Sequence, residues 1–241
     1  MTLILADGGP VIPNYGKATG CIADNNAFFC TKWIRQHWAD TLQPALIQHI
    51  WLTAIAVVIG FAIAFLAALV AHRVGWFAPP FSALAAFLYT IPSIALFQVL
   101  VPITGLTVTT IEIGLVGYTL LILFANTLAG LRSVPPDVIE AARGMGLTRG
   151  QILRRVELPL AMPAISAGIR IAAVTTISLA TVAAYITPYG LGKPIFDGLQ
   201  INYHTEYVVS GVLAIALAVV ADGLLVIVQR RLTPWRRAAL A

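Results

Sequence analysis

The sequence predicts an all-α integral membrane protein with five transmembrane helices. The chain has 241 residues, of which 59% are hydrophobic and only 10% are charged, whereas a soluble domain carries roughly 25% charged residues. Its apolar stretches reach about 20 residues, the length that a helix needs to cross a ~30 Å hydrocarbon core. They are apolar on every side, unlike the alternating strands of a β-barrel. A large soluble enzyme, a nucleic-acid-binding domain and a secreted disulfide scaffold are excluded.

The elements follow in order along the chain. Residues 1–43 form an N-terminal tail, residues 44–234 the transmembrane domain and residues 235–241 a C-terminal tail. Aromatic residues gather at positions 28–38 and predict an interfacial helix before the first span; a docking surface for an external partner is the alternative. The expected spans are Ile50–Ala71, Phe81–Val101, Ile113–Leu131, Ala164–Ile186 and Val208–Val228.

The connecting segments carry their basic residues unevenly, which predicts the orientation in the cell membrane. The first loop, the third loop (residues 132–163) and the C-terminal tail hold ten Lys and Arg residues, whereas the N-terminal tail and the other loops hold four. Basic loops stay in the cytoplasm. We therefore expect the N-terminus outside and the C-terminus inside.

The two cysteines, Cys21 and Cys30, both lie in the expected external tail. An oxidising exterior permits a disulfide between them, and two free thiols are the alternative. Too few other ligands lie nearby for a metal site, so no bound metal is expected.

The third loop is the most informative segment, and its first half predicts a short helix. Pro135 and Pro136 suit a first helical turn, where a backbone N–H has no partner in any case. Gly144 and Gly146 permit backbone conformations that other residues avoid, so they end this helix.

The second half of the loop predicts another short helix. Thr148 and Gln151 have the spacing of a capping box, and an apolar stripe follows. Pro159 and Pro163 are expected to end this helix before the fourth span. Composition alone would favour a solvated amphipathic loop lying on the membrane.

A resemblance to a known family favours a specific role for this loop. Glu140-Ala-Ala, then Gly146, then Val156-Glu-Leu-Pro159 resemble the EAA loop of ABC importer permeases, with Val156 in place of an isoleucine. The resemblance implies a type I ABC importer permease core, in which this cytoplasmic helical coupling loop docks into a groove on a separate ATPase. The implied coupling residues are Glu140, Ala141, Ala142, Gly144, Gly146, Ile152, Val156, Leu158 and Pro159.

The resemblance extends over most of the chain. Residues 88–97, 158–170 and 194–199 are similar to permeases for quaternary amines such as glycine betaine, choline and carnitine, whereas residues 185–192 depart from that pattern. It implies ATPase subunits that carry ATP and Mg²⁺, a second permease copy or paralogue, and an extracytoplasmic solute-binding protein. This chain has no phosphate-binding loop, so we expect it not to hydrolyse ATP itself. No catalytic arrangement of residues is found in the sequence either, so we expect no enzymatic activity and no bound cofactor. A permease for another solute, such as an amino acid, is the alternative.

Polar groups within the spans predict a translocation pathway. Pro92 breaks the helical hydrogen-bond ladder, and we expect a kink facing a cavity. The fourth span carries polar residues on one arc, which either line the pathway or hydrogen-bond between helices. The candidate pathway residues are Tyr89, Thr90, Pro92, Ser93, Gln98, Thr175, Ser178, Thr181 and Tyr185.

Two ionisable residues, Arg170 and Asp222, are expected inside spans at matching depth. An isolated charge there is costly, so we hypothesise a structural ion pair; separate snorkelling of Arg170 and solvation of Asp222 is the alternative. A stand-alone secondary transporter would need embedded ionisable residues for ion coupling, and only these two qualify. His49, His72 and His204 are interpreted as interfacial residues.

Overall fold

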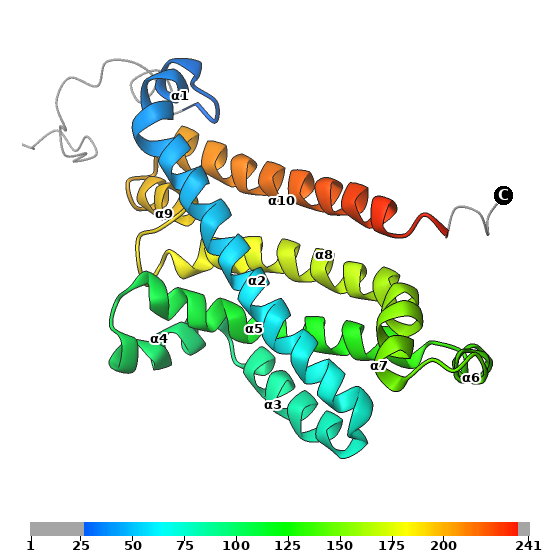
Figure 1. Cartoon of the computed structure of the whole chain (residues 1–241). Coiled ribbons are helices and arrows are strands. Elements are labelled where there is room, and N and C mark those ends of the chain that lie inside the picture. The colour runs from blue at the N-terminus through cyan, green and yellow to red at the C-terminus, as the bar shows by residue number, and fades with distance from the viewer. Residues whose placement is uncertain (1–26, 236–241) are drawn as a thin grey trace, which may run out of the picture.

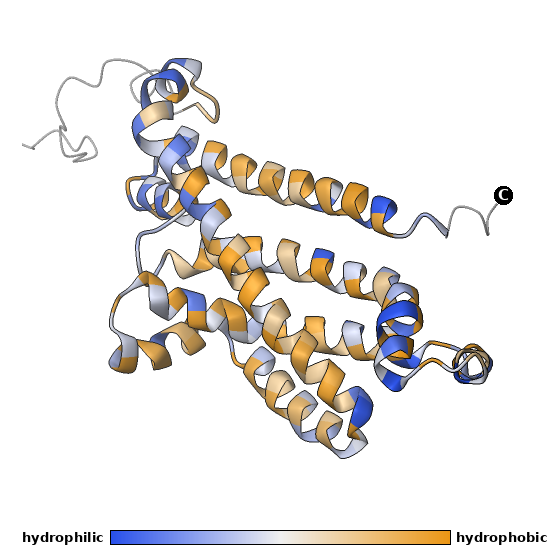
Figure 2. Cartoon of the chain, in the orientation of Figure 1, coloured by the Kyte–Doolittle hydropathy of each residue, from blue (hydrophilic) through white to orange (hydrophobic). Residues whose placement is uncertain are grey.

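The computed structural model describes residues 27–235, and the regular structure in this range is helical (Figure 1). Four helical segments are long and apolar enough to cross a membrane, and a bent pair of helices makes a fifth candidate. Figure 2 shows hydrophobic residues along the long helices and hydrophilic residues at their two ends. The prediction of an all-helical membrane protein is therefore confirmed.

The first span is longer than expected, because the helix begins well before the apolar stretch. Helix α1 (Thr31–His37) continues through a π-helical turn, η1 (Trp38–Leu42), into α2 (Gln43–Arg73). The helical path thus covers 43 residues without a break. The boundary expected at residue 43 lies inside this path. The segment before the span packs against the start of the last helix, since Phe28 stacks on His204 and Trp33 meets the edge of Tyr203.

The second span is broken rather than kinked, which corrects the expectation at Pro92. Helix α3 (Ala78–Thr90) and helix α4 (Ser93–Thr104) meet at an angle of 100°. Ile91 and Pro92 both have extended backbone, with ψ of 130° and 135°. Proline disfavours the helical conformation of the residue before it and lacks an N–H. Two consecutive residues therefore leave the helix, and the chain turns sharply.

Helices α2, α5 (Val108–Arg132) and α8 (Leu158–Ala183) pack together as the core. Their approach depends on small residues. A Cβ on Gly60 would lie 1.9 Å from Thr119 Oγ1, and one on Gly168 would lie 2.6 Å from Asn126 Cβ. Close contact between backbones is how helices associate where no hydrophobic effect drives them together.

The helix after the third loop does not end at Pro159 or Pro163, contrary to expectation. Helix α7 (Arg149–Ile152) continues through a π-helical turn, η3 (Leu153–Glu157), into α8. Pro159 falls in the first turn of α8. In the π-turn, the N–H of Leu158 bonds to Leu153 O, and such a widened turn relieves the clash that proline makes with the preceding turn.

Helix α9 (Gly192–Gln200) and helix α10 (His204–Leu232) complete the described chain. Figure 1 shows α10 along one edge of the bundle, where it packs on α8 and α9. Most of its apolar surface is exposed, as suits a helix that faces lipid or another subunit.

Candidate functional site

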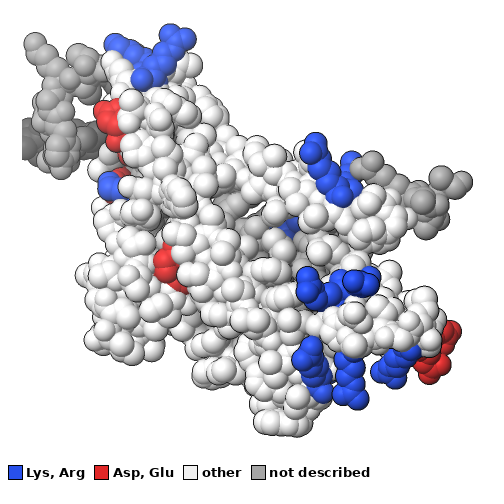
Figure 3. Space-filling model, viewed as in Figure 1, with Lys and Arg blue, Asp and Glu red and all other residues white. Residues whose placement is uncertain are grey.

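One end of the molecule gathers basic side chains, and the third loop lies there. Figure 3 shows this cluster across the ends of α2 and α10 and the segment between α5 and α8. The described basic residues of these segments are Arg73, Arg132, Arg143, Arg149, Arg154, Arg155, Arg230 and Arg231. Lys32, Arg35 and Lys193 belong to α1 and α9, at the opposite end. The uneven loop charges therefore become a basic end of the folded chain.

The first helix of the loop, α6 (Pro136–Gly144), begins and ends as its sequence predicts. It ends in a Schellman motif: the N–H of Leu147 donates to Ala142 O at 3.2 Å, and that of Gly146 donates to Arg143 O at 2.9 Å. Gly146 has φ of +80°, whereas Gly144 does not have positive φ. Only Gly146 therefore needs to be glycine for backbone reasons, which corrects the role assigned to Gly144.

The capping box predicted at Thr148 starts the second helix. Thr148 N–H donates to Gln151 Oε1 at 2.8 Å, and Gln151 N–H donates to Thr148 Oγ1 at 3.4 Å. Two backbone donors at the helix start thereby find partners. Because α7 runs on into α8, this cap also fixes where the 35-residue helical segment Arg149–Ala183 begins.

The candidate coupling residues divide into an outward set and an inward set. Glu140, Ala141, Gly144 and Gly146 are exposed, so a partner could contact them. Ala142 is 1% exposed and Ile152 is 4% exposed, and Val156, Leu158 and Pro159 are half-buried. Helix α6 packs on α7 and η3. The inward set thus packs the loop together, and the outward set forms the surface that a partner could contact.

A side-chain contact attaches the loop to the first span. His72 Nε2, near the end of α2, lies 3.2 Å from Glu157 Oε2 in η3, 85 residues later. Glu157 is buried. A movement of the loop would therefore act on α2 as well as on α8.

The candidate pathway residues of the broken span lie beside α5. Tyr118 of α5 donates a hydrogen bond to Ile91 O, a carbonyl at the break, and its ring meets Tyr89 edge-on at 5.9 Å. Tyr89, Thr90, Pro92 and Gln98 are exposed within this single chain, and Ser93 is partly exposed. The break thus presents aromatic and polar groups on an uncovered surface.

Among the described residues, the threonine hydroxyls of this arc bond within α8 itself. Thr175 donates to Ile171 O, and Thr181 donates to Ser178 O within the same helix at 2.5 Å. Ser178 and Tyr185 are exposed, and Thr175 and Thr181 are partly exposed. Of the two interpretations of this arc, a polar surface is the one that these bonds favour.

Arg170 and Asp222 lie together, joining α8 to α10. Arg170 Nε donates to Asp222 Oδ1 at 2.8 Å, and its second terminal nitrogen donates to Oδ2 at 2.9 Å. This is the bidentate geometry that makes arginine–carboxylate pairs strong and directional. Each side chain thereby supplies the opposite charge to the other, as expected of a structural pair.

Two ionisable residues lie in surroundings that the sequence did not indicate. His49 is fully buried rather than interfacial: its Nε2 lies 3.0 Å from Ile177 O in α8, and Leu191 N–H donates to Nδ1 at 3.2 Å. These partners specify a neutral ring protonated on Nε2. The expected third span begins at Ile113, but α5 also includes Glu112, whose Oε2 is buried without a hydrogen-bond partner among the described residues.

The tail cysteines are described only in part. Cys30 is buried and is not a free thiol, which favours the disulfide over two free thiols. Cys21 lies outside the described residues.

Comparisons with known proteins agree with this architecture. The chain belongs to the family of binding-protein-dependent transport system inner membrane components, which it matches over residues 57–235. It is therefore a multi-pass inner membrane permease subunit of an ABC transporter, a non-catalytic component without a bound cofactor of its own.

Particular relatives sharpen the comparison. The choline transport system permease protein OpuBB of Bacillus subtilis is 35% identical over 188 residues, covering 78% of this chain and 86% of that protein. The osmoprotectant import permease protein OsmW of Salmonella typhimurium is 38% identical over 202 residues, covering 81% and 94%. A chain of the MetNI methionine ABC transporter, solved facing inward, has a TM-score of 0.64 at 21% identity, covering 76% and 94%. That likeness supports the fold alone.

Proposed function

We propose that this chain forms the translocation pathway for a quaternary amine osmolyte, such as glycine betaine, choline or carnitine. The observation that carries the proposal is the similarity to OpuBB and OsmW over about four fifths of the chain. The uncovered aromatic and polar surface at the α3–α4 break is consistent with it, because aromatic faces attract quaternary ammonium ions.

The arrangement of charges supports a specific topology and set of partners. The basic end faces the cytoplasm, which places α6 where a separate ATPase subunit can dock, and the N-terminus lies outside. ATP and Mg²⁺ bind to that ATPase. An extracytoplasmic binding protein delivers the solute, and a second permease copy or paralogue covers the exposed surface of α3, α4 and α8.

Uptake by a deletion strain and its complementation in the native host test the solute. Cells lacking this chain, grown at high salt, should lose uptake of labelled glycine betaine, choline or carnitine, and the wild-type chain should restore it. Labelled methionine serves as the control solute. Restoration of methionine uptake, without any effect on the three amines, would overturn the substrate assignment.

A matched pair of variants on α6 tests the coupling role. Glu140 and Asp137 are both exposed acidic residues of this helix, but only Glu140 belongs to the EAA motif. Glu140→Ala should reduce uptake about tenfold, the effect of losing one charge-assisted contact of ~1.4 kcal/mol, while Asp137→Ala keeps uptake near the wild-type level. Equal losses in both variants, at matched amounts of protein in the membrane, would contradict docking through the motif.

A further inference from the structure

A hollow of about 490 Å³ lies between the end of α2 and the coupling loop. Three arginines from three different elements line it: Arg73 from α2, Arg143 from α6 and Arg149 from α7. Ile139, one helical turn before Arg143, lines the same side of α6. This side differs from the outward surface that carries Glu140 and Ala141.

The hollow has an excess of positive charge. Glu157 is the only carboxylate among the residues that line it, and it is already engaged by His72 at 3.2 Å. No salt bridge within residues 27–235 involves Arg73, Arg143 or Arg149. Three exposed arginines therefore line a space whose one acidic residue, among the described residues, is already engaged.

The position of the hollow fits the headgroup layer of the membrane. Arg73 is the last residue of α2, and Trp76, which is 76% exposed, follows three residues later. Tryptophan at the end of a span marks the depth of the lipid headgroups. A ligand reaching this hollow from the bilayer would thus meet the arginines with its headgroup.

We propose that the hollow binds the phosphodiester headgroup of an anionic phospholipid. The planar fork of arginine matches phosphate oxygens in bidentate geometry, and basic hollows at helix ends hold such headgroups. A bound headgroup would connect α2, α6 and α7, and so would steady the coupling loop from the membrane side. The proposal does not depend on which solute the chain carries.

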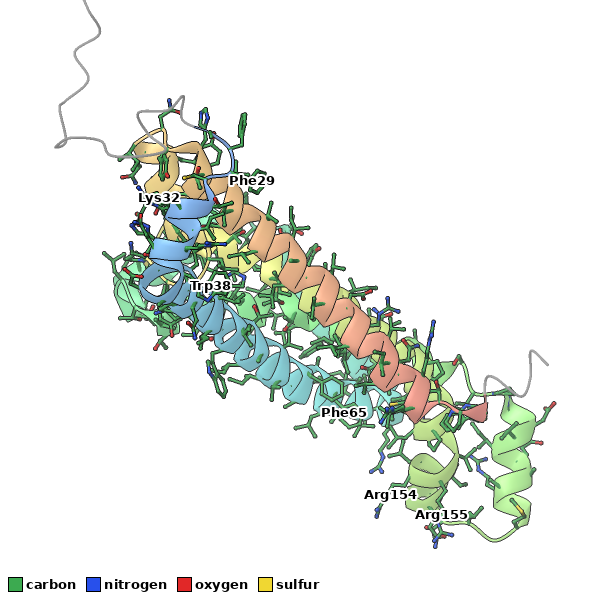
Figure 4. All side chains as sticks on the ribbon, turned by 90° about the horizontal axis from the view of Figure 1, so that it is seen from above. Phe29, Lys32, Trp38, Phe65, Arg154 and Arg155 are labelled. Carbon is green, nitrogen blue, oxygen red and sulfur yellow. The ribbon has the colours of Figure 1, made fainter. Side chains whose placement is uncertain are left out.

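Lipid titration of the full-length chain, purified in detergent and followed by native mass spectrometry, tests the proposal. Phosphatidylglycerol should bind more tightly than phosphatidylcholine, which carries the same phosphate without net charge. The double variant Arg73→Gln with Arg149→Gln should weaken the first phosphatidylglycerol site about thirtyfold, given the usual attraction of each basic residue to anionic lipid. The matched control is Arg154→Gln with Arg155→Gln, two arginines that do not line the hollow and that point outward from η3 in Figure 4.

Each outcome decides the matter. Equal affinity of the wild-type chain for the two lipids would overturn the proposal without any variant. An equal loss of phosphatidylglycerol affinity in both double variants would show that diffuse surface charge, and not the hollow, attracts the lipid. Competition by soluble glycerol phosphate at similar concentrations would identify a small-anion site instead of a lipid site. Should the first double variant aggregate, Arg73→Lys with Arg149→Lys keeps the charge, and it should bind more weakly than the wild type because lysine lacks the fork.

Discussion

The two glycines at the end of α6 permit a sharp test of how backbone conformation controls the coupling loop. Gly144 and Gly146 are two residues apart, and a Cβ added to either would meet nothing within 4 Å. They differ in one respect, since only Gly146 has positive φ, +80°. Alanine at either position therefore tests the backbone without a steric clash.

The two alanine substitutions should change the stability of the loop in opposite directions. At Gly146 an L-residue must adopt the left-handed region, which costs about 1–2 kcal/mol, and the two Schellman hydrogen bonds depend on that conformation. At Gly144, the last residue of α6, alanine should stabilise the helix by about 0.5–1 kcal/mol. The variants should differ by about 2 kcal/mol. Gly146→Asn should fall between them, because asparagine tolerates this region.

Hydrogen–deuterium exchange of residues 136–152 in the purified chain measures these differences, since about 1.4 kcal/mol corresponds to a tenfold change in protection. Gly146→Ala should lower protection of the loop about tenfold, and Gly144→Ala should leave it equal or higher. Solute uptake should follow the same order. Equal protection in the two alanine variants, or asparagine behaving worse than alanine at position 146, would refute the reasoning.

Three further predictions concern the spans and the tail. Neutralising Arg170 or Asp222 alone should lower the amount of folded protein in the membrane, and exchanging the two residues should restore part of it; strictly additive losses would contradict a structural pair. Tyr118→Phe leaves Ile91 O without its partner and should lower the melting temperature in detergent, by an amount equivalent to about 1 kcal/mol; an unchanged melting temperature would exclude that bond. A membrane-impermeant thiol reagent should label Cys30 in intact cells only after reduction, and labelling that requires permeabilised cells would reverse the proposed topology.

Local features of the fold followed from the sequence because short segments determine them. The Thr148–Gln151 capping box and the end of α6 at Gly146 both depend on neighbours within a few residues, and the structure confirms them. The apolar stretches likewise identified the spans, although the helices extend beyond them: α5 begins at Val108 instead of Ile113. Because the expected span was delimited by its apolar residues, it left out the polar residues at the start of the helix, Glu112 among them.

Prolines show where local rules were insufficient. Pro92 and Pro159 each suggest a disturbed helix, yet one ends a helix in a 100° turn and the other is absorbed by a π-turn. Beside Pro92, the carbonyl of Ile91 accepts a hydrogen bond from Tyr118, 27 residues away. Beside Pro159, Glu157 pairs with His72. Which outcome a proline has depends on partners that distant segments supply.

The sequence alone determined the class of protein, the spans, the uneven charge of the loops and the coupling motif, because each depends on composition or on spacing along the chain. The tertiary structure alone decided the burial of His49 between α8 and Leu191 and the hollow lined by Arg73, Arg143 and Arg149. It also gave the bidentate geometry of the Arg170–Asp222 contact, a pairing that the sequence had suggested. These features join residues more than 50 positions apart, and such contacts arise only when the helices pack.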